Sequence, residues 1–152
     1  MKDYQKRIVV QKPANQVYAA ITEHISDWWT NDLSGSASQK GDSFKIAFGG
    51  TRKTMEISEI LPNQKVVWTC TQAYIDMDSL ENKSEWLGTK IIWELSTEGQ
   101  TTTLEFLHQG LNKDLQCYNV CQDGWNTFLG SLESYLKTGQ GKPFLKRTIK
   151  TV

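Results

Sequence analysis

Apolar residues in the last third of the chain recur at the spacing of an α-helix. Over residues 114–139 they follow one another at three- and four-residue steps, and most positions between them are polar. The spacing predicts a helix over 114–139, ended by Gly139, Gly141 and Pro143. Its predicted buried stripe consists of Tyr118, Cys121, Trp125, Phe128, Leu129, Leu132, Tyr135 and Leu136.

The middle of the chain, residues 42–109, has a period of two. Hydrophobic residues alternate with Thr, Lys, Glu and Ser in five runs, as in an antiparallel sheet with one face in solvent. Three short links, GGTRK, LPNQ and STEGQ, are typical of hairpins, so we expect consecutive strands to pair. The predicted inner residues are Phe44, Ile46 and Phe48; Met55 and Ile57; Val66, Trp68 and Cys70; Ile91, Trp93 and Leu95; and Leu104, Phe106 and His108.

The link over residues 72–88 is too long for a hairpin. It carries four carboxylates, at Asp76, Asp78, Glu81 and Glu85, but their spacing lacks the Gly and the final Glu of a calcium-binding EF-hand loop. We therefore expect a solvated, mobile flap.

The N-terminal part predicts a strand over residues 4–10, which ends in an Ile-Val-Val run, and then a helix that begins at Pro13. A second helical turn is expected around residues 25–30, and residues 31–42 have the composition of a loop. The order of elements predicts one α+β domain over 1–152.

A sheet with one apolar face must be covered, and only the C-terminal helix is long enough to cover it. The facing residues are large and aromatic, so they either fill the core or line a cavity between sheet and helix. Gly124 and Gly130 each cost about 1 kcal/mol relative to Ala inside a helix, which suggests close approach of another segment.

Four motifs together resemble a known family. They are Trp28-Trp29-Thr30, the VVWT run at 66–69, His108-Gln109-Gly110, and the helix with Gly124-Trp125, Leu129, Leu132, Tyr135, Leu136 and Gly139. This set resembles the START-like helix-grip superfamily, and within it the branch named after the activator of the 90-kDa heat-shock protein ATPase. The resemblance spans nearly the whole chain. It implies a curved antiparallel sheet of about six strands wrapped around a long C-terminal helix, with an apolar pocket between them, and many superfamily members bind lipids, sterols or polyketides.

Charge and cysteine content narrow the function classes. The 17 Lys and Arg balance the 17 Asp and Glu, so no net field favours nucleic acid or an anionic membrane. A basic tail over 140–152 is expected to be solvated. No run has the length of a signal peptide or membrane span, which predicts a cytoplasmic protein. The 3 cysteines lack metal-site spacing, so we expect free thiols, no metal and no cofactor.

The candidate site is the inner aromatic face, where His108 is the one histidine and so a candidate acid or base. Its alternative role is to tie the strand end to neighbouring backbone. We consider three hypotheses: a non-enzymatic binder of a hydrophobic small molecule, a module that binds a chaperone, and a cyclase or hydratase using His108. The protein is expected to be a monomer or homodimer. The predicted ligand-binding residues are Trp28, Phe44, Phe48, Met55, Trp68, Cys70, Trp93, Phe106, His108, Trp125 and Leu129.

Overall fold

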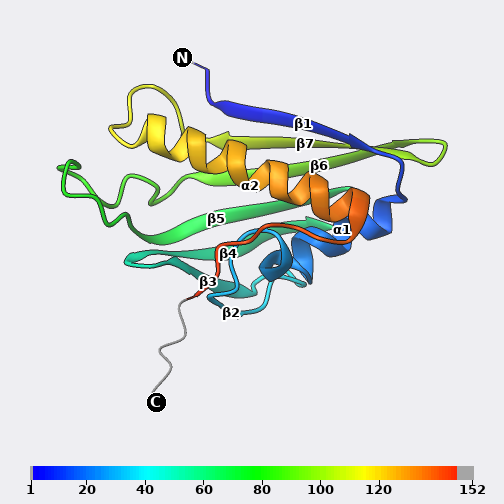
Figure 1. Ribbon diagram of the computed structural model, residues 1–152, viewed down its shortest axis with the longest axis horizontal. Helices are drawn as coiled ribbons and strands as arrows, with labels where there is room; N and C mark the ends of the chain where they lie inside the picture. The colour runs from blue at the N-terminus through cyan, green and yellow to red at the C-terminus, as the bar shows by residue number, and fades with distance from the viewer. Residues whose placement is uncertain (1, 147–152) are drawn as a thin grey trace.

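The computed structural model of the protein describes residues 2–146. A curved sheet lies on one side, and the helices lie together on its other side (Figure 1). The elements are β1 (Tyr4–Val10), α1 (Ala14–Thr22), the 3-10 helix η1 (Ile25–Asp27), β2 (Leu33–Gly35), β3 (Ser43–Phe48), β4 (Thr51–Leu61), β5 (Lys65–Tyr74), β6 (Lys90–Glu98), β7 (Thr101–Gln109) and α2 (Tyr118–Thr138).

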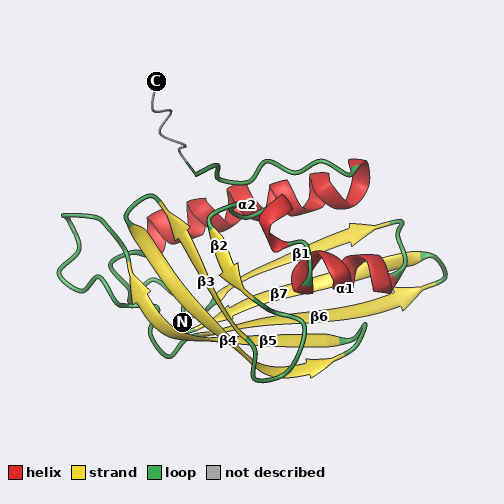
Figure 2. Ribbon diagram, turned by 90° about the horizontal axis from the view of Figure 1, so that it is seen from below, coloured by secondary structure: helices red, strands yellow, loops and turns green. Residues whose placement is uncertain are grey.

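The sheet has seven strands in the order β1-β7-β6-β5-β4-β3-β2, and every neighbouring pair is antiparallel. The predicted pairing of consecutive strands from β3 to β7 is confirmed, and β1 adds to β7 at the edge. Figure 2 shows the sheet curving beneath α2, with α1 on the same side. This is the predicted α+β helix-grip arrangement.

Three element boundaries differ from the prediction. Residues 31–42 were expected to be a loop, but Leu33–Gly35 pairs with β3 and gives the sheet a seventh strand. The expected second helical turn is the single 3-10 turn η1. Helix α2 begins at Tyr118 rather than residue 114, because the preceding residues form turns in which Leu115 N–H donates to the Asn112 carbonyl.

The predicted inner residues of the strands are buried, apart from half-buried Phe48. On α2 the predicted stripe faces the sheet: Cys121, Trp125, Leu129, Leu132 and Leu136 are buried. The other three stripe residues, Tyr118, Phe128 and Tyr135, are half-buried. The period of each segment therefore identified most of the side chains that β3 to β7 and α2 contribute to the layer between them.

The connection between β5 and β6 is docked on the molecule, which contradicts the prediction of a free flap. Ile75, Leu80 and Trp86 are buried. The Glu85 carboxylate accepts the backbone N–H groups of Gln116 and Cys117, at 3.0 and 2.9 Å. A carboxylate in this position satisfies free donors at the start of α2 and interacts favourably with the helix dipole.

The glycines of α2 do not mark a close approach, so that prediction was wrong. A β-carbon at Gly124 or Gly130 would meet nothing within 4 Å. Gly141, after the helix, is the crowded position, because its β-carbon would lie 2.5 Å from the Asp27 carbonyl oxygen.

The segment after α2 runs back over η1 instead of extending into solvent. Lys142 N–H donates to Ser131 Oγ at 2.6 Å, and Phe144 N–H donates to the Trp29 carbonyl at 2.8 Å. The backbone of residues 140–146 is thus held against the molecule, while Lys142 and Lys146, the basic side chains of this part of the tail, are exposed to solvent. The rest of the expected tail, 147–152, lies outside the described residues. No helix in the described part is long and apolar enough to cross a membrane.

Candidate functional site

The eleven predicted site residues lie between the sheet and α2. Ten of them are buried and Phe48 is half-buried. They come from the turn after η1 (Trp28), from β3 to β7, and from α2. The structure therefore brings the whole predicted set into one layer.

All six tryptophans of the chain belong to a single cluster in this layer. Trp29, which was not in the predicted set, is at its centre and stacks on Trp28, Trp68 and Trp125 with ring centroids 5.8, 5.7 and 5.0 Å apart. Trp86 joins through Trp125, at 5.8 Å. Trp86 was missed because the acidic, non-periodic sequence around it predicts an exposed loop.

Two buried indole nitrogens in this cluster have no hydrogen-bond acceptor in the described part of the chain. Within residues 2–146, Nε1 of Trp68 and Nε1 of Trp93 are both inaccessible to solvent and without a partner. Their rings lie 5.2 Å apart, edge to face. A buried donor without an acceptor costs about 1–3 kcal/mol. In contrast, Trp28 Nε1 donates to the Ala20 carbonyl at 2.8 Å.

His108 has a partner at each ring nitrogen. Trp125 Nε1 donates to Nδ1 at 3.0 Å, so the imidazole proton lies on Nε2. Nε2 is 2.9 Å from Thr89 Oγ1, which itself donates to the Trp86 carbonyl at 2.6 Å. Burial, and then the nearby charge of Lys53, lower the pKa of His108 to about 3. The ring is therefore neutral, and it ties β7 to α2 and to the loop before β6.

Lys53 brings a charge into the same interior. It is 8% exposed and shares the inner face of β4 with Met55 and Ile57. Its Nζ lies 3.3 Å from the centroid of the Trp86 ring. Burial lowers the pKa of this amine to about 8, although three nearby thiols act in the opposite direction. Sequence reasoning overlooked Lys53 because a lysine in an alternating run is read as part of the solvent face.

The three cysteines are free and buried around this lysine. Burial raises the pKa of Cys70 to about 11. The pKa of Cys117 is also raised, because its thiol donates to Cys121. That hydrogen bond, followed by the Lys53 charge and the Trp86 N–H at 3.2 Å, lowers the pKa of Cys121 to about 7.

Three half-buried phenylalanines form the edge of the layer, and we call them the aromatic rim: Phe48, Phe128 and Phe144. Phe48 lies 5.3 Å from Phe128 and 5.6 Å from Phe144, between ring centroids. Lys53 Nζ is 5.8 Å from the Phe48 ring. The rim therefore joins the tip of the β3–β4 hairpin to α2 and to the segment after it, with Lys53 behind Phe48.

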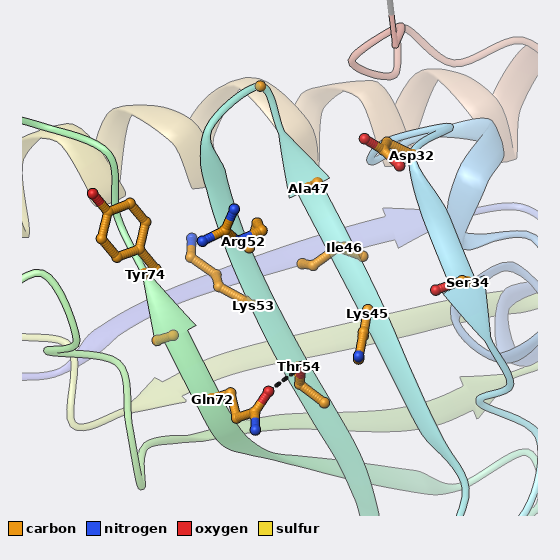
Figure 3. Close-up of a pocket in the computed structure, with 12 residues that line it drawn as sticks. Asp32, Ser34, Lys45, Ile46, Ala47, Arg52, Lys53, Thr54, Gln72 and Tyr74 are labelled. Atoms are coloured by element: carbon orange, nitrogen blue, oxygen red, sulfur yellow. Dashed lines mark hydrogen bonds between the residues drawn. The ribbon is translucent and has the colours of Figure 1, made fainter.

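A pocket of about 510 Å³ lies on the opposite, outer face of the sheet (Figure 3). Lys45, Arg52, Thr54, Gln72 and Tyr74 are among the residues that line it, and Thr54 Oγ1 donates to Gln72 Oε1 at 3.3 Å. Simple alternation along β5 places Cys70, Gln72 and Tyr74 on one face. The register shift opposite Thr54 and Met55 inserts an extra residue after Cys70, which moves Gln72 and Tyr74 to the outer face.

A seven-stranded antiparallel sheet that curves around a long C-terminal helix defines the class of this protein, the START-like helix-grip fold. Within that class, the chain belongs to the family described as "Activator of Hsp90 ATPase homolog 1-like protein", which matches residues 11–137. The predicted resemblance is thus confirmed.

Solved structures have the same fold. The Aha1 dimer from Colwellia psychrerythraea is 29% identical, with a TM-score of 0.73, and the match covers 93% of this chain and 100% of that one. DynU16, a putative protein in the dynemicin biosynthetic locus, is 20% identical at a TM-score of 0.70, covering 96% of this chain and 51% of that one. PFC0360w, an HSP90 activator from Plasmodium falciparum, is 16% identical at a TM-score of 0.66, covering 90% and 96%. None of the curated proteins matches the chain.

Proposed function

We propose that the protein binds a hydrophobic small molecule, without catalysis, between the sheet and α2. The observation that supports this most directly is the pair of buried indole N–H groups of Trp68 and Trp93, which have no acceptor within residues 2–146. An apolar ligand with a carbonyl or ether oxygen, such as a lipid, a polyketide or an aromatic ketone, would supply that acceptor. The surrounding rings would contact its apolar part.

The aromatic rim is the proposed entrance. Its three side chains come from separate segments, and all are half-buried. Rotation of Phe48 and Phe128 would open the layer at the hairpin tip without breaking the strand pairing of β3 with β4.

The test uses two ligands of matched shape, 2-acetylnaphthalene, which carries an acceptor, and 2-ethylnaphthalene, which does not. Titration calorimetry should give about tenfold tighter binding of the ketone, because one net hydrogen bond is worth about 1–1.5 kcal/mol. The double variant Trp68→Phe, Trp93→Phe should lose that preference. Trp28→Phe is the matched control, since its N–H already has an acceptor and the preference should remain.

Absence of binding to either naphthalene and to a wider panel of fatty acids and polyphenols would refute the proposal. A crystal structure with a ligand between Trp68 and Trp93 would support it. Water alone at those nitrogens, with no ligand bound in any titration, would count against it.

Interaction with a chaperone is a second proposed function, favoured by the family and by the 29% identity to the Colwellia Aha1. The outer-face pocket is the surface we propose for it, because it is open and carries exposed Lys45 and Arg52. The charge-reversed variant Lys45→Glu, Arg52→Glu should then lose capture of an Hsp90-type chaperone and stimulation of its ATPase. Trp68→Phe, which changes only the interior, should retain both.

No capture and no stimulation by the unaltered protein would exclude this second function. The Colwellia protein is a dimer. Light scattering would decide between a monomer and a homodimer for this chain.

Acid–base chemistry at His108 receives less support from the geometry than either function. Both ring nitrogens are already in hydrogen bonds, and the ring is neutral. A cyclase or hydratase mechanism would require one of these bonds to break before His108 could exchange a proton with a substrate.

A further inference from the structure

Lys53 is the charged side chain that the fold buries among residues 2–146. It arises from the inner face of β4, and its amine lies between the rings of Trp86 and Phe48, at 3.3 and 5.8 Å from their centroids. Its neighbours on the same face, Met55 and Ile57, are apolar and fully buried. The chain thus places a cation directly behind the aromatic rim.

No carboxylate balances this cation. None of the ion pairs or hydrogen bonds between side chains in the described part of the chain includes the Lys53 amine. Moving an ammonium out of water costs more free energy than a single cation–π contact returns. Burial lowers the pKa of Lys53 only to about 8, so the amine is still mostly protonated at pH 7.

The groups that face the amine from the other elements do not supply a full counter-charge. His108 on β7 is neutral, and Cys70 on β5 and Cys117 before α2 are neutral thiols. Cys121 on α2 is the one partly ionised group. Its sulfur is held by the Trp86 N–H on the indole edge, whereas the amine lies over the ring face.

We infer that Lys53 is the counter-charge for a carboxylate, so that the ligand of the interior is an apolar carboxylic acid. This inference rests on the proposed binding function and adds the chemical class of the ligand. The carboxylate would displace the amine from the Trp86 ring and pair with it in a charge-assisted hydrogen bond, while the apolar part contacts Phe48 and Phe128. The oxygens of a carboxylate are also acceptors of the kind that the free indole donors need.

The experiment compares decanoate with decanamide, which have the same chain and differ in charge. Decanoate should bind the unaltered protein at least about tenfold more tightly at pH 7, because a charge-assisted hydrogen bond is roughly twice as strong as a neutral one. Lys53→Met should bind both equally, and Lys53→Arg should keep the preference. Lys45→Met is the matched control, since Lys45 lies on the outer face of the neighbouring strand.

The outcomes separate the two proposals. If neither compound binds the unaltered protein, the binding function and the role of Lys53 both fail. If both bind with equal affinity, binding stands and the role of Lys53 is refuted, as it also is when Lys53→Met keeps the preference. A readout in the unaltered protein is the ¹⁵N signal of the Lys53 amine, which decanoate should shift and decanamide should not.

Discussion

At the scale of single residues, the buried side-chain nitrogens differ in how many hydrogen-bond partners they have. His108 has two partners, Trp28 has one, and the indole nitrogens of Trp68 and Trp93 have none among the described residues. A buried donor without an acceptor costs more free energy than a completed hydrogen bond contributes. The unpaired indole donors and the buried amine of Lys53 therefore lower the stability of the fold, whereas the fully paired ring of His108 does not. The number of partners therefore distinguishes His108, which has a structural role, from Trp68, Trp93 and Lys53, which we assign to ligand binding.

A pH-dependent loss of stability is predicted from His108. Its pKa is about 3 in the folded protein against an ordinary 6.5, so the unfolded chain binds the extra proton first as pH falls. The contribution of the neutral His108 ring to the free energy of unfolding is complete above pH 6.5 and is lost between pH 6.5 and 3. At pH 5 the loss is about 2 kcal/mol, taken from 1.36 kcal/mol per pKa unit. Urea unfolding at pH 7 and pH 5 measures it.

The variant His108→Gln does not titrate and should show a smaller loss between the two pH values. His24→Gln, at an exposed histidine, should behave like the unaltered protein. Equal losses in His108→Gln and the unaltered protein would contradict the prediction. Should His108→Gln fail to fold, the imidazole ¹⁵N signals at pH 5 would still show whether Nδ1 stays unprotonated.

The elements follow from local sequence, but their ends depend on tertiary contacts. Periods of two and of three to four residues identified β3 to β7 and α2, because each period places one apolar face toward the same layer. Helix α2 begins at Tyr118 and not at the predicted residue 114. Just before it, the backbone N–H groups of Gln116 and Cys117 donate to the carboxylate of Glu85, which comes from a distant loop. Strand β2 has only three residues, too few for a recognisable alternation.

Alanine at two glycines, Gly124 within α2 and Gly141 after it, is predicted to change the free energy of unfolding in opposite directions. Gly124→Ala should raise the free energy of unfolding by about 0.5–1 kcal/mol, because the site is helical and a β-carbon meets nothing within 4 Å. Gly141→Ala should lower it by about 1–3 kcal/mol, because its β-carbon would lie 2.5 Å from the Asp27 carbonyl oxygen. Denaturant unfolding of the two variants measures both changes. Tolerance of Ala at 141 would mean that the segment after α2 does not lie against η1 in solution.

The whole molecule is a curved sheet whose inner face meets α2 through aromatic side chains. Its two faces carry different chemistry: apolar rings with one buried amine inside, and a polar pocket outside. The two proposed functions use different faces. Variants of Trp68 therefore test ligand binding separately from variants of Lys45 and Arg52, which test chaperone binding, whereas Lys53 lies at the border because it also lines the outer pocket.

The sequence by itself determined the apolar face of each strand from β3 to β7 and of α2, because periodicity and residue size fix that face, but not the burial of Lys53 and Trp86. It also carried the family, through motifs such as Trp28-Trp29 and Gly124-Trp125. Only the tertiary structure decided which buried groups find partners. Long-range packing gave His108 the Trp125 donor, left the Trp68 and Trp93 donors free within residues 2–146, and placed Lys53 on Trp86. These hydrogen bonds and charge contacts join atoms from segments that are distant in the sequence, and local periodicity does not show which distant segments come into contact.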